Sequence, residues 1–224
     1  FGTLGMWNIY MSAGSPYYTQ LTGTASYEDD FASGNFTAAT GAKDLVADFA
    51  SIGLWLYKGA SPNGWYQISS MSANRVKEVK FVGGSQDDEL LAEDNAGGLY
   101  WGNWNGSTFV WTLITSTDIG PGSAWCETFD QDGTDSGDQE VAIPWTAGGA
   151  SIYDYSAGGT MSGWISTSAY VKYLVKGDYF GKGRDSTIAM VLTDAGSFPG
   201  LWLYEQNEAP GSIRISASIP DGGY

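Results

Sequence analysis

The segment Asp130–Asp138 carries the clearest signal for chemistry in this chain. It reads DQDGTDSGD, so carboxylates recur at short intervals around glycines. Ca²⁺ takes about six to eight oxygen ligands, and carboxylates placed around a glycine turn can converge on one such ion. We therefore predict a structural Ca²⁺ site here, and the alternative is a solvated acidic turn. The predicted ligands are Asp130, Asp132, Asp135 and Asp138.

Tryptophan provides the second candidate chemistry, because the chain contains ten of these residues. An indole ring can stack on the apolar face of a sugar while nearby amides bond its hydroxyls. Trp104 lies between Asn103 and Asn105 and is the first candidate for such a site. The other tryptophans near turns rich in Asn, Gly and Ser are Trp101, Trp145 and Trp164.

Catalysis has less support. Glu89, Glu93, Asp48 and Asp94 flank predicted strands and could form the paired carboxylates of a glycoside hydrolase. Acids beside turns are usually solvated, however, and the short loops leave little to build a cleft. Cys126 is the only cysteine and the chain has no histidine, so the usual base for a thiol nucleophile is missing. We therefore predict a protein that is not an enzyme, with Cys126 as a small buried apolar residue.

The charge of the chain restricts its partners. Ten Lys and Arg residues against 25 Asp and Glu residues give a net charge of −15. Such a surface repels phosphate backbones and anionic lipids, so we expect no nucleic-acid partner. No apolar run approaches the roughly 18 residues needed to span a bilayer, and we expect no membrane insertion. The chain opens on Phe1, which suggests a processed or partial chain.

These candidates are carried by a repeated unit. The sequence GLWLY at Gly53–Tyr57 recurs unchanged at Gly200–Tyr204, and looser copies begin at Gly5, Gly98 and Gly149. Counted at positions 7, 55, 100, 151 and 202, successive copies are 48, 45, 51 and 51 residues apart. A four-stranded propeller blade uses about 40–50 residues. We expect Trp55 and Trp202, inside these apolar strands, to be packing residues.

Each unit has the pattern of four short strands joined by tight turns. In one unit the strands are predicted at 76–82, 89–92, 99–101 and 109–113. The 32 glycines and an aromatic share of 15% fit many short strands and turns. Corresponding second strands are predicted at 44–47, 140–143 and 187–191, and last strands at 17–21, 65–69, 163–166 and 212–216.

The predicted fold is an all-β, five-bladed propeller in a single domain, 1–224. Residues 1–25 form a half blade that 216–224 complete, which closes the ring and removes exposed sheet edges. The complete blades are predicted at about 26–70, 71–115, 122–168 and 169–216. One strand of the split blade is unaccounted for: the ring closes imperfectly, the chain is incomplete, or another chain donates the strand.

With its acidic loop, short apolar strand and Gly-aromatic strand, the chain resembles FG-GAP or VCBS propeller repeats, which occur in integrin alpha subunits and secreted bacterial proteins. The resemblance covers the layout of four units, and Asp130–Asp138 approaches the calcium pattern of that family. In the last unit, Lys182 and Arg184 are expected to replace a metal. The resemblance implies an extracellular, mostly non-catalytic binding or scaffold module.

The sequence therefore predicts a secreted or cell-surface module that binds glycans or glycoconjugates and has a structural Ca²⁺ site. The alternative is a self-assembling structural or adhesive subunit, a homo-oligomer or filament, in which a neighbouring chain donates a strand. Sequons at Asn35 and Asn105 permit glycosylation.

Overall fold

The structure is a computed structural model in which the chain is almost entirely β. It describes residues 6–12, 15–22, 31–37, 43–59, 64–82, 88–117, 119, 125–130, 139–155, 159–165, 170–181, 186–193, 199–204 and 212–216. Within these ranges the only helical element is a 3-10 turn, η2 (Ala50–Ile52). None of the described segments forms a helix that is long and apolar enough to cross a membrane.

Sixteen of the strands form four sheets of four antiparallel strands each, in which sequence neighbours pair. Sheet I contains β3 (Phe31–Gly34), β4 (Asp44–Asp48), β5 (Leu54–Lys58) and β6 (Gly64–Ser69). Sheet II contains β7 (Ala73–Val79), β8 (Glu89–Asp94), β9 (Leu99–Trp104) and β10 (Phe109–Thr115). Sheet III contains β11 (Glu127–Phe129), β12 (Glu140–Pro144), β13 (Ala150–Asp154) and β14 (Thr160–Ile165). Sheet IV contains β15 (Tyr170–Gly177), β16 (Thr187–Thr193), β17 (Gly200–Tyr204) and β18 (Ser212–Ser216). The all-β class is confirmed, and so is the four-stranded sheet predicted for each complete unit.

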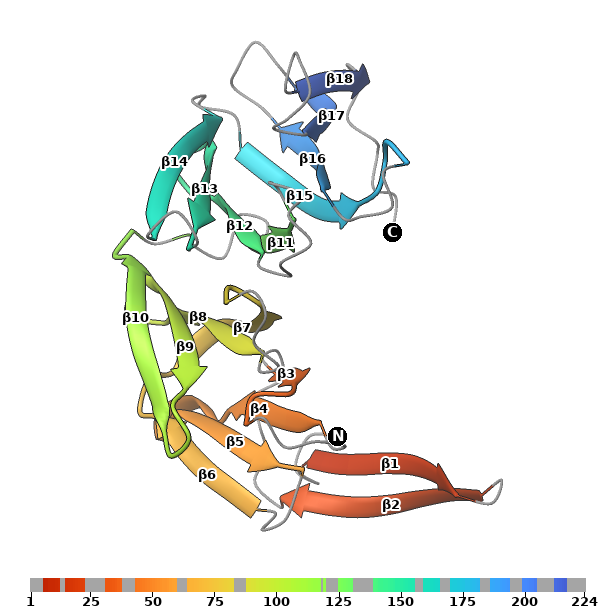
Figure 1. Ribbon diagram of the computed structural model, residues 1–224, viewed down its shortest axis with the longest axis vertical. Helices are drawn as coiled ribbons and strands as arrows, with labels where there is room; N and C mark the ends of the chain where they lie inside the picture. The colour runs from red at the N-terminus through yellow and green to blue at the C-terminus, as the bar shows by residue number, and fades with distance from the viewer. Residues whose placement is uncertain are drawn as a thin grey trace.

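The four sheets follow one another along an arc, with the first strands β3, β7, β11 and β15 on its concave side (Figure 1). A separate N-terminal hairpin, β1 (Met6–Ser12) and β2 (Ser15–Thr22), lies at the sheet I end. Sheet IV lies at the opposite end. None of the described sheets is closed, and the segments 1–5 and 217–224 fall outside the described residues. Closure into a five-bladed ring therefore stays a prediction.

Apolar side chains fill the spaces between consecutive sheets. We call the face that a sheet turns toward the next sheet its leading face, and the opposite one its trailing face. On the leading face of sheet I, Val46, Leu54 and Leu56 are fully buried against Leu90 and Ala92 of sheet II. Because successive residues of a strand point to opposite faces, a sheet covered on both sides needs an almost continuous apolar run. The second strands, such as the Leu-Leu-Ala run of β8, have that composition.

The same arrangement joins the later sheets. Leu91 and Leu99 of sheet II pack with Val141 and Ile143 of sheet III. Sheets III and IV share two smaller clusters, one of which contains Ala142, Ile152 and Ile188. Each cluster joins neighbouring sheets only.

The repeated pentapeptide buries its leucines more deeply than its tryptophans. Leu54 and Leu56 have no exposed surface, whereas Trp55 points to the other face and is half-buried. Trp202 packs, partly buried, at the sheet III–IV junction. The motif begins with glycine because Gly53 has φ of +82° and a Cβ there would lie 2.3 Å from a backbone oxygen.

Paired hydrogen bonds also link consecutive units beside the concave edge. Asp88 N–H donates to Asn35 O at 3.0 Å, and Asp88 Oδ2 accepts from Asn35 N–H at 2.6 Å. Between the next two units, Gln139 N–H donates to Lys80 O at 2.7 Å, and Gln139 Oε1 accepts from Lys80 N–H at 3.2 Å. In both bridges the residue after a first strand meets the residue that precedes the second strand of the following unit.

The duplicated pentapeptide provides a matched test of the packing between sheets. Leu56→Ala should lower the free energy of unfolding by about 2–5 kcal/mol, because it leaves a cavity in a covered interface. Leu203→Ala removes the same atoms from the second copy, but Leu203 is partly exposed, and it should cost about 1 kcal/mol. Denaturant unfolding in dilute solution measures both values. Equal losses would contradict the assignment of covered and uncovered faces.

Candidate binding pocket

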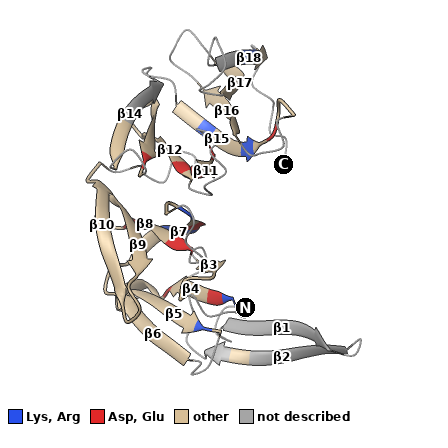
Figure 2. Cartoon of the chain, viewed as in Figure 1, with Lys and Arg blue, Asp and Glu red and all other residues tan. Residues whose placement is uncertain are grey.

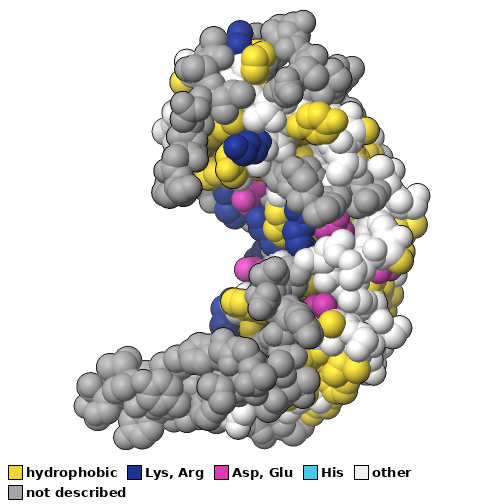
Figure 3. Space-filling view, turned by 180° about the vertical axis from the view of Figure 1, so that it is seen from behind, with side chains coloured by type: hydrophobic (Ala, Val, Ile, Leu, Met, Phe, Trp, Pro, Cys, Tyr) yellow, Lys and Arg dark blue, Asp and Glu magenta, His cyan; other side chains and the backbone are white. Residues whose placement is uncertain are grey.

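A pocket of about 370 Å³ lies on the concave side, where the first strands of the sheets come together. Charged residues lie on the inner strands β7, β11 and β15 and also on the second strands β4 and β8, while β6, β9 and β10 carry none (Figure 2). In the space-filling view, basic and acidic side chains meet where the molecule is hollowed (Figure 3). The polar lining comes from Ser33, Lys77, Glu78, Glu127, Thr128, Gln139 and Lys176.

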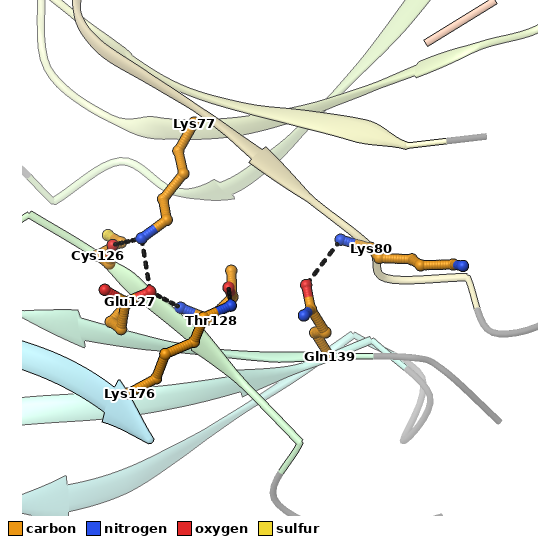
Figure 4. Close-up of polar contacts among 7 residues, drawn as sticks. All are labelled: Lys77, Lys80, Cys126, Glu127, Thr128, Gln139 and Lys176. Carbon is orange, nitrogen blue, oxygen red and sulfur yellow. Dashed lines mark hydrogen bonds and ion pairs between the residues drawn. The ribbon is translucent and has the colours of Figure 1, made fainter. Parts of the chain in front are cut away.

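The central contact of the pocket is an ion pair between sheets II and III. Lys77 Nζ lies 2.6 Å from Glu127 Oε1 and 3.2 Å from the carbonyl oxygen of Cys126 (Figure 4). Glu127 Oε1 also accepts a hydrogen bond from the Thr128 N–H at 3.0 Å. The Lys77 and Glu127 side chains are only 25% and 17% exposed, so the pair is partly shielded from water.

Two further side chains complete the polar wall. Lys176 extends from β15, with Nζ at 3.5 Å from Thr128 Oγ1 (Figure 4). No carboxylate of the described residues lies within ion-pair distance of this ammonium group. Gln139 faces the pocket from the start of sheet III and is held by its bridge to Lys80. The Lys176 ammonium group therefore keeps N–H donors for a ligand, and Gln139 keeps its side-chain NH2 group, while its Oε1 already accepts from the Lys80 N–H.

Glu78 lies at the edge of the pocket among several charges. Partial burial raises the pKa of Glu78 above its usual value, and the neighbouring Asp88 carboxylate raises it further. Lys43, Lys176 and Lys77 act in the opposite direction. The pocket thus combines donors and acceptors whose charges are close to balanced.

The predicted sugar-binding residue Trp104 lies elsewhere, at the margin between sheets I and II. Its ring contacts Phe109 edge-on at 5.8 Å, and Lys58 Nζ lies 4.5 Å from its centroid. Lys58 also lies 4.7 Å from the centre of the Tyr66 ring. Asn103 is partly buried, and Asn105 is exposed in the hairpin turn, where its Oδ1 accepts from two backbone N–H groups and the Ser107 hydroxyl.

The remaining predicted tryptophans do not join Trp104. Trp101 is 6% exposed and packs against Phe81 and Tyr155 between sheets II and III, which argues against a stacking role. Trp145 is partly buried at the same junction, and its indole N–H donates to Ser151 Oγ at 3.0 Å. The side chain of Trp164 in β14 lies outside the described residues.

Most of the predicted calcium loop falls outside the described part of the chain. Asp130, half-buried at the end of β11, is its only described ligand, because residues 131–138 are not described. The segments that the structure does describe contain no group of three or more Asp, Glu, Cys or His residues suited to a metal. The Ca²⁺ site therefore stays a prediction, as does the replacement of a metal by Lys182 and Arg184.

The acids considered for catalysis have structural contacts, and three of them are buried rather than solvated as expected. Glu89 Oε2 accepts from the Phe81 N–H at 2.9 Å. Glu93 is fully buried and bonds Arg75 Nε at 2.7 Å. Asp48 and Asp94 each accept from the backbone N–H two residues later, at Ala50 and Ala96. Asp94 alone of the four is partly exposed.

From the sequence, Glu89 was only a catalytic candidate, and the recurrence of a buried acid at the start of the second strands was not predicted. Asp44, Glu89 and Glu140 are 1–2% exposed, and Thr187 takes this position in sheet IV. Asp44 bonds the Thr37 N–H and hydroxyl at 2.9 and 2.8 Å, and the Gly59 N–H at 3.0 Å. The acid therefore ties Thr37, at the end of the described segment after β3, and Gly59, just after β5, to the start of β4. Alignment of the second strands already placed these residues in register, which is the signal that could have revealed them.

Cys126 is buried at the sheet II–III junction, as expected from its apolar character. Burial raises the pKa of its thiol to about 12, so the thiol is protonated at neutral pH.

Comparison with known proteins adds no assignment. A scan against protein-family models finds no match for this chain, and a search of curated proteins finds no significant match. The resemblance to FG-GAP and VCBS repeats stays a prediction.

Asp48 allows a test of burial through pH. Burial raises the pKa of Asp48 above 3.8, so the folded state holds this proton to a higher pH than the unfolded state. Its contribution to stability is therefore greatest at low pH and falls as pH rises through the raised pKa. Asp48→Asn should raise the free energy of unfolding at pH 7, with a smaller gain near pH 3.

Asp94→Asn is the matched control, because Asp94 makes the same local bond but is partly exposed. It should give little gain at pH 7. Denaturant melts of both variants at several pH values measure the effect, and a pH-independent loss in Asp48→Asn would contradict the argument.

Proposed function

We propose that this chain is a non-catalytic binding module that takes a glycan in the concave pocket. The observation that supports the proposal is the composition of the pocket, in which Lys77, Lys176, Glu78, Glu127 and Gln139 line one hollow. Its volume of about 370 Å³ is in the range typical of small-molecule sites.

A sugar suits this lining because each of its hydroxyl groups both donates and accepts hydrogen bonds. Ammonium groups of Lys77 and Lys176 supply donors, carboxylates of Glu78 and Glu127 supply acceptors, and the Gln139 amide supplies both. With two positive and two negative groups, this set favours a neutral, polyhydroxylated ligand over a polyanion. The strong negative charge of the whole chain also opposes polyanions.

We place this function outside the cell, at a surface or in the medium, with Ca²⁺ in a structural role at the Asp130–Asp138 loop. This location and this ion are supported by the acidic composition and the resemblance to extracellular repeats. The loop joins β11 to β12, and Gln139 follows it directly, so an ordered loop would fix one wall of the pocket.

A glycan array followed by calorimetry tests the proposal. The protein should bind one family of neutral glycans saturably, and Lys176→Ala should weaken that binding about tenfold or more, since hydrogen bonds to charged groups contribute roughly 1.5–3 kcal/mol. Gln139→Ala should weaken it as well. Lys172→Ala, on the exposed part of the same strand, is the matched control and should bind like the wild type.

Two outcomes would redirect or reject the proposal. Loss of binding in Trp104→Ala together with normal binding in Lys176→Ala would move the site to the outer margin of sheets I and II. A blank array with demonstrably folded protein would reject glycan binding.

The calcium part of the proposal has its own measurement. Addition of a chelator should lower the thermal midpoint of the wild type, because an ion that binds only the folded state stabilises it. The double variant Asp132→Asn/Asp135→Asn should show no such response to chelator. An unchanged midpoint in the wild type would leave the loop as a solvated acidic turn.

A further inference from the structure

The last sheet of the arc has an uncovered apolar face. On the leading face of sheet IV, Tyr173 and Val175 of β15 are each 53% exposed. Val191, Leu201 and Leu203 continue this face across β16 and β17 and are partly exposed. On sheet I the equivalents of the two leucines, Leu54 and Leu56, are fully buried by the next sheet.

The exposed residues on the first strand of sheet IV differ in chemistry from the residues at the equivalent first-strand positions of sheets II and III. Val175 lies on the first strand of sheet IV, opposite the third residue of the second strand of that sheet. Lys77 in sheet II and Glu127 in sheet III occupy the equivalent position. At those positions Lys77 and Glu127 form an ion pair that tolerates water. A valine and a tyrosine on the first strand of sheet IV favour burial, and a continuous exposed apolar face of this kind marks an interaction surface.

At the opposite end of the arc, where the N-terminal hairpin lies beside sheet I (Figure 1), sheet I still exposes a second apolar surface. The trailing face of sheet I carries Phe31, which is 65% exposed, and the partly exposed Leu45, Trp55 and Tyr57. These residues lie on the side of sheet I that no later sheet covers, since they alternate with the buried Ala32, Val46, Leu54 and Leu56. Both end faces are therefore apolar.

We propose that a second copy of this chain covers these faces, head to tail, so that the leading face of sheet IV packs on the trailing face of sheet I of the next copy. This contact continues the three junctions already present within the chain, each of which joins a leading to a trailing face. Contacts between different surfaces of this kind build a closed ring of copies or an open filament.

The width of the surfaces favours a second copy over the chain's own ends. The N-terminal hairpin has two strands, and its repeat position corresponds to the third and fourth strands of a unit. It would cover the outer half of sheet IV and leave Tyr173 and Val175 on the innermost strand in water. Sheet I has four strands and spans the whole face. The hairpin also lies at the far end of the arc from sheet IV (Figure 1).

Charge complementarity at the concave edge supports the same contact. Within the chain, the residue after a first strand bonds the residue before the next second strand, as in the Asn35–Asp88 and Lys80–Gln139 bridges. At the proposed junction these positions are Asp178 of one copy and Lys43 of the next. The Lys43 side chain is 69% exposed, with its ammonium group 3.6 Å from Asp88 of its own chain. Lys43 and Asp178 carry opposite charges.

Light scattering coupled to size exclusion tests the proposal on the full chain over a range of concentrations. The wild type should show masses that are multiples of 23.9 kDa and increase with concentration. Val175→Glu removes one surface and Phe31→Glu removes the other, so each variant alone should have the monomer mass. An equimolar mixture should form a species of two copies and nothing larger, because it retains one intact pair of surfaces.

Val110→Glu is the matched control, since Val110 is 50% exposed on the outer strand β10, and it should assemble like the wild type. Circular dichroism and unfolding midpoints confirm that all variants are folded. A wild type that stays monomeric at every concentration would overturn the proposal and leave the faces to the chain's own ends. Assembly of Phe31→Glu alone would indicate pairing of two sheet IV faces and would overturn the head-to-tail arrangement.

Discussion

The organisation of this protein depends on the need of a two-faced apolar sheet for a neighbour on each side. Antiparallel sheets in many proteins have one apolar face and one polar face, but the second strands here are apolar on both. Every sheet therefore needs two neighbours, and a row of such sheets is stable only where each space between them is filled. Curvature follows because the first strands lie closer together than the last ones, which leaves the pocket on the concave side. The pocket is thus a product of packing and not of one motif.

Repetition made the elements predictable. The GLWLY duplication and its spacing located strands such as β5 and β17 because the hairpins are local and their turns are marked by glycine. The strand ends were less predictable: the first strand of the second sheet was predicted at 76–82, but β7 spans Ala73–Val79 and ends before Phe81. Whether a ring closes depends on contacts between the ends, which local patterns do not encode.

Side-chain roles were harder to predict than strands. Trp101 and Trp104 are three residues apart in β9, so they point to opposite faces and pack in different junctions. The Asn, Gly and Ser residues around them, on which the prediction was based, did not distinguish the two. The pocket was not foreseen because Lys77, Glu127, Gln139 and Lys176 come from three units and occupy different positions in each. The buried acids were misjudged for a related reason. An acid at a strand start is usually solvated, but here the Thr37 N–H, from the segment before β4, and the Gly59 N–H, just after β5, satisfy the carboxylate of Asp44.

Cys126 has a consequence for observing how these sheets separate. Its thiol is 1% exposed between sheets II and III, and the buried thiol is protonated at neutral pH. A thiol reagent needs both access and a thiolate, and the intact junction denies it both. Labelling of the chain's single cysteine therefore requires the two sheets to separate. The rate of modification under native conditions thus reports how often this one junction opens, and no probe has to be introduced.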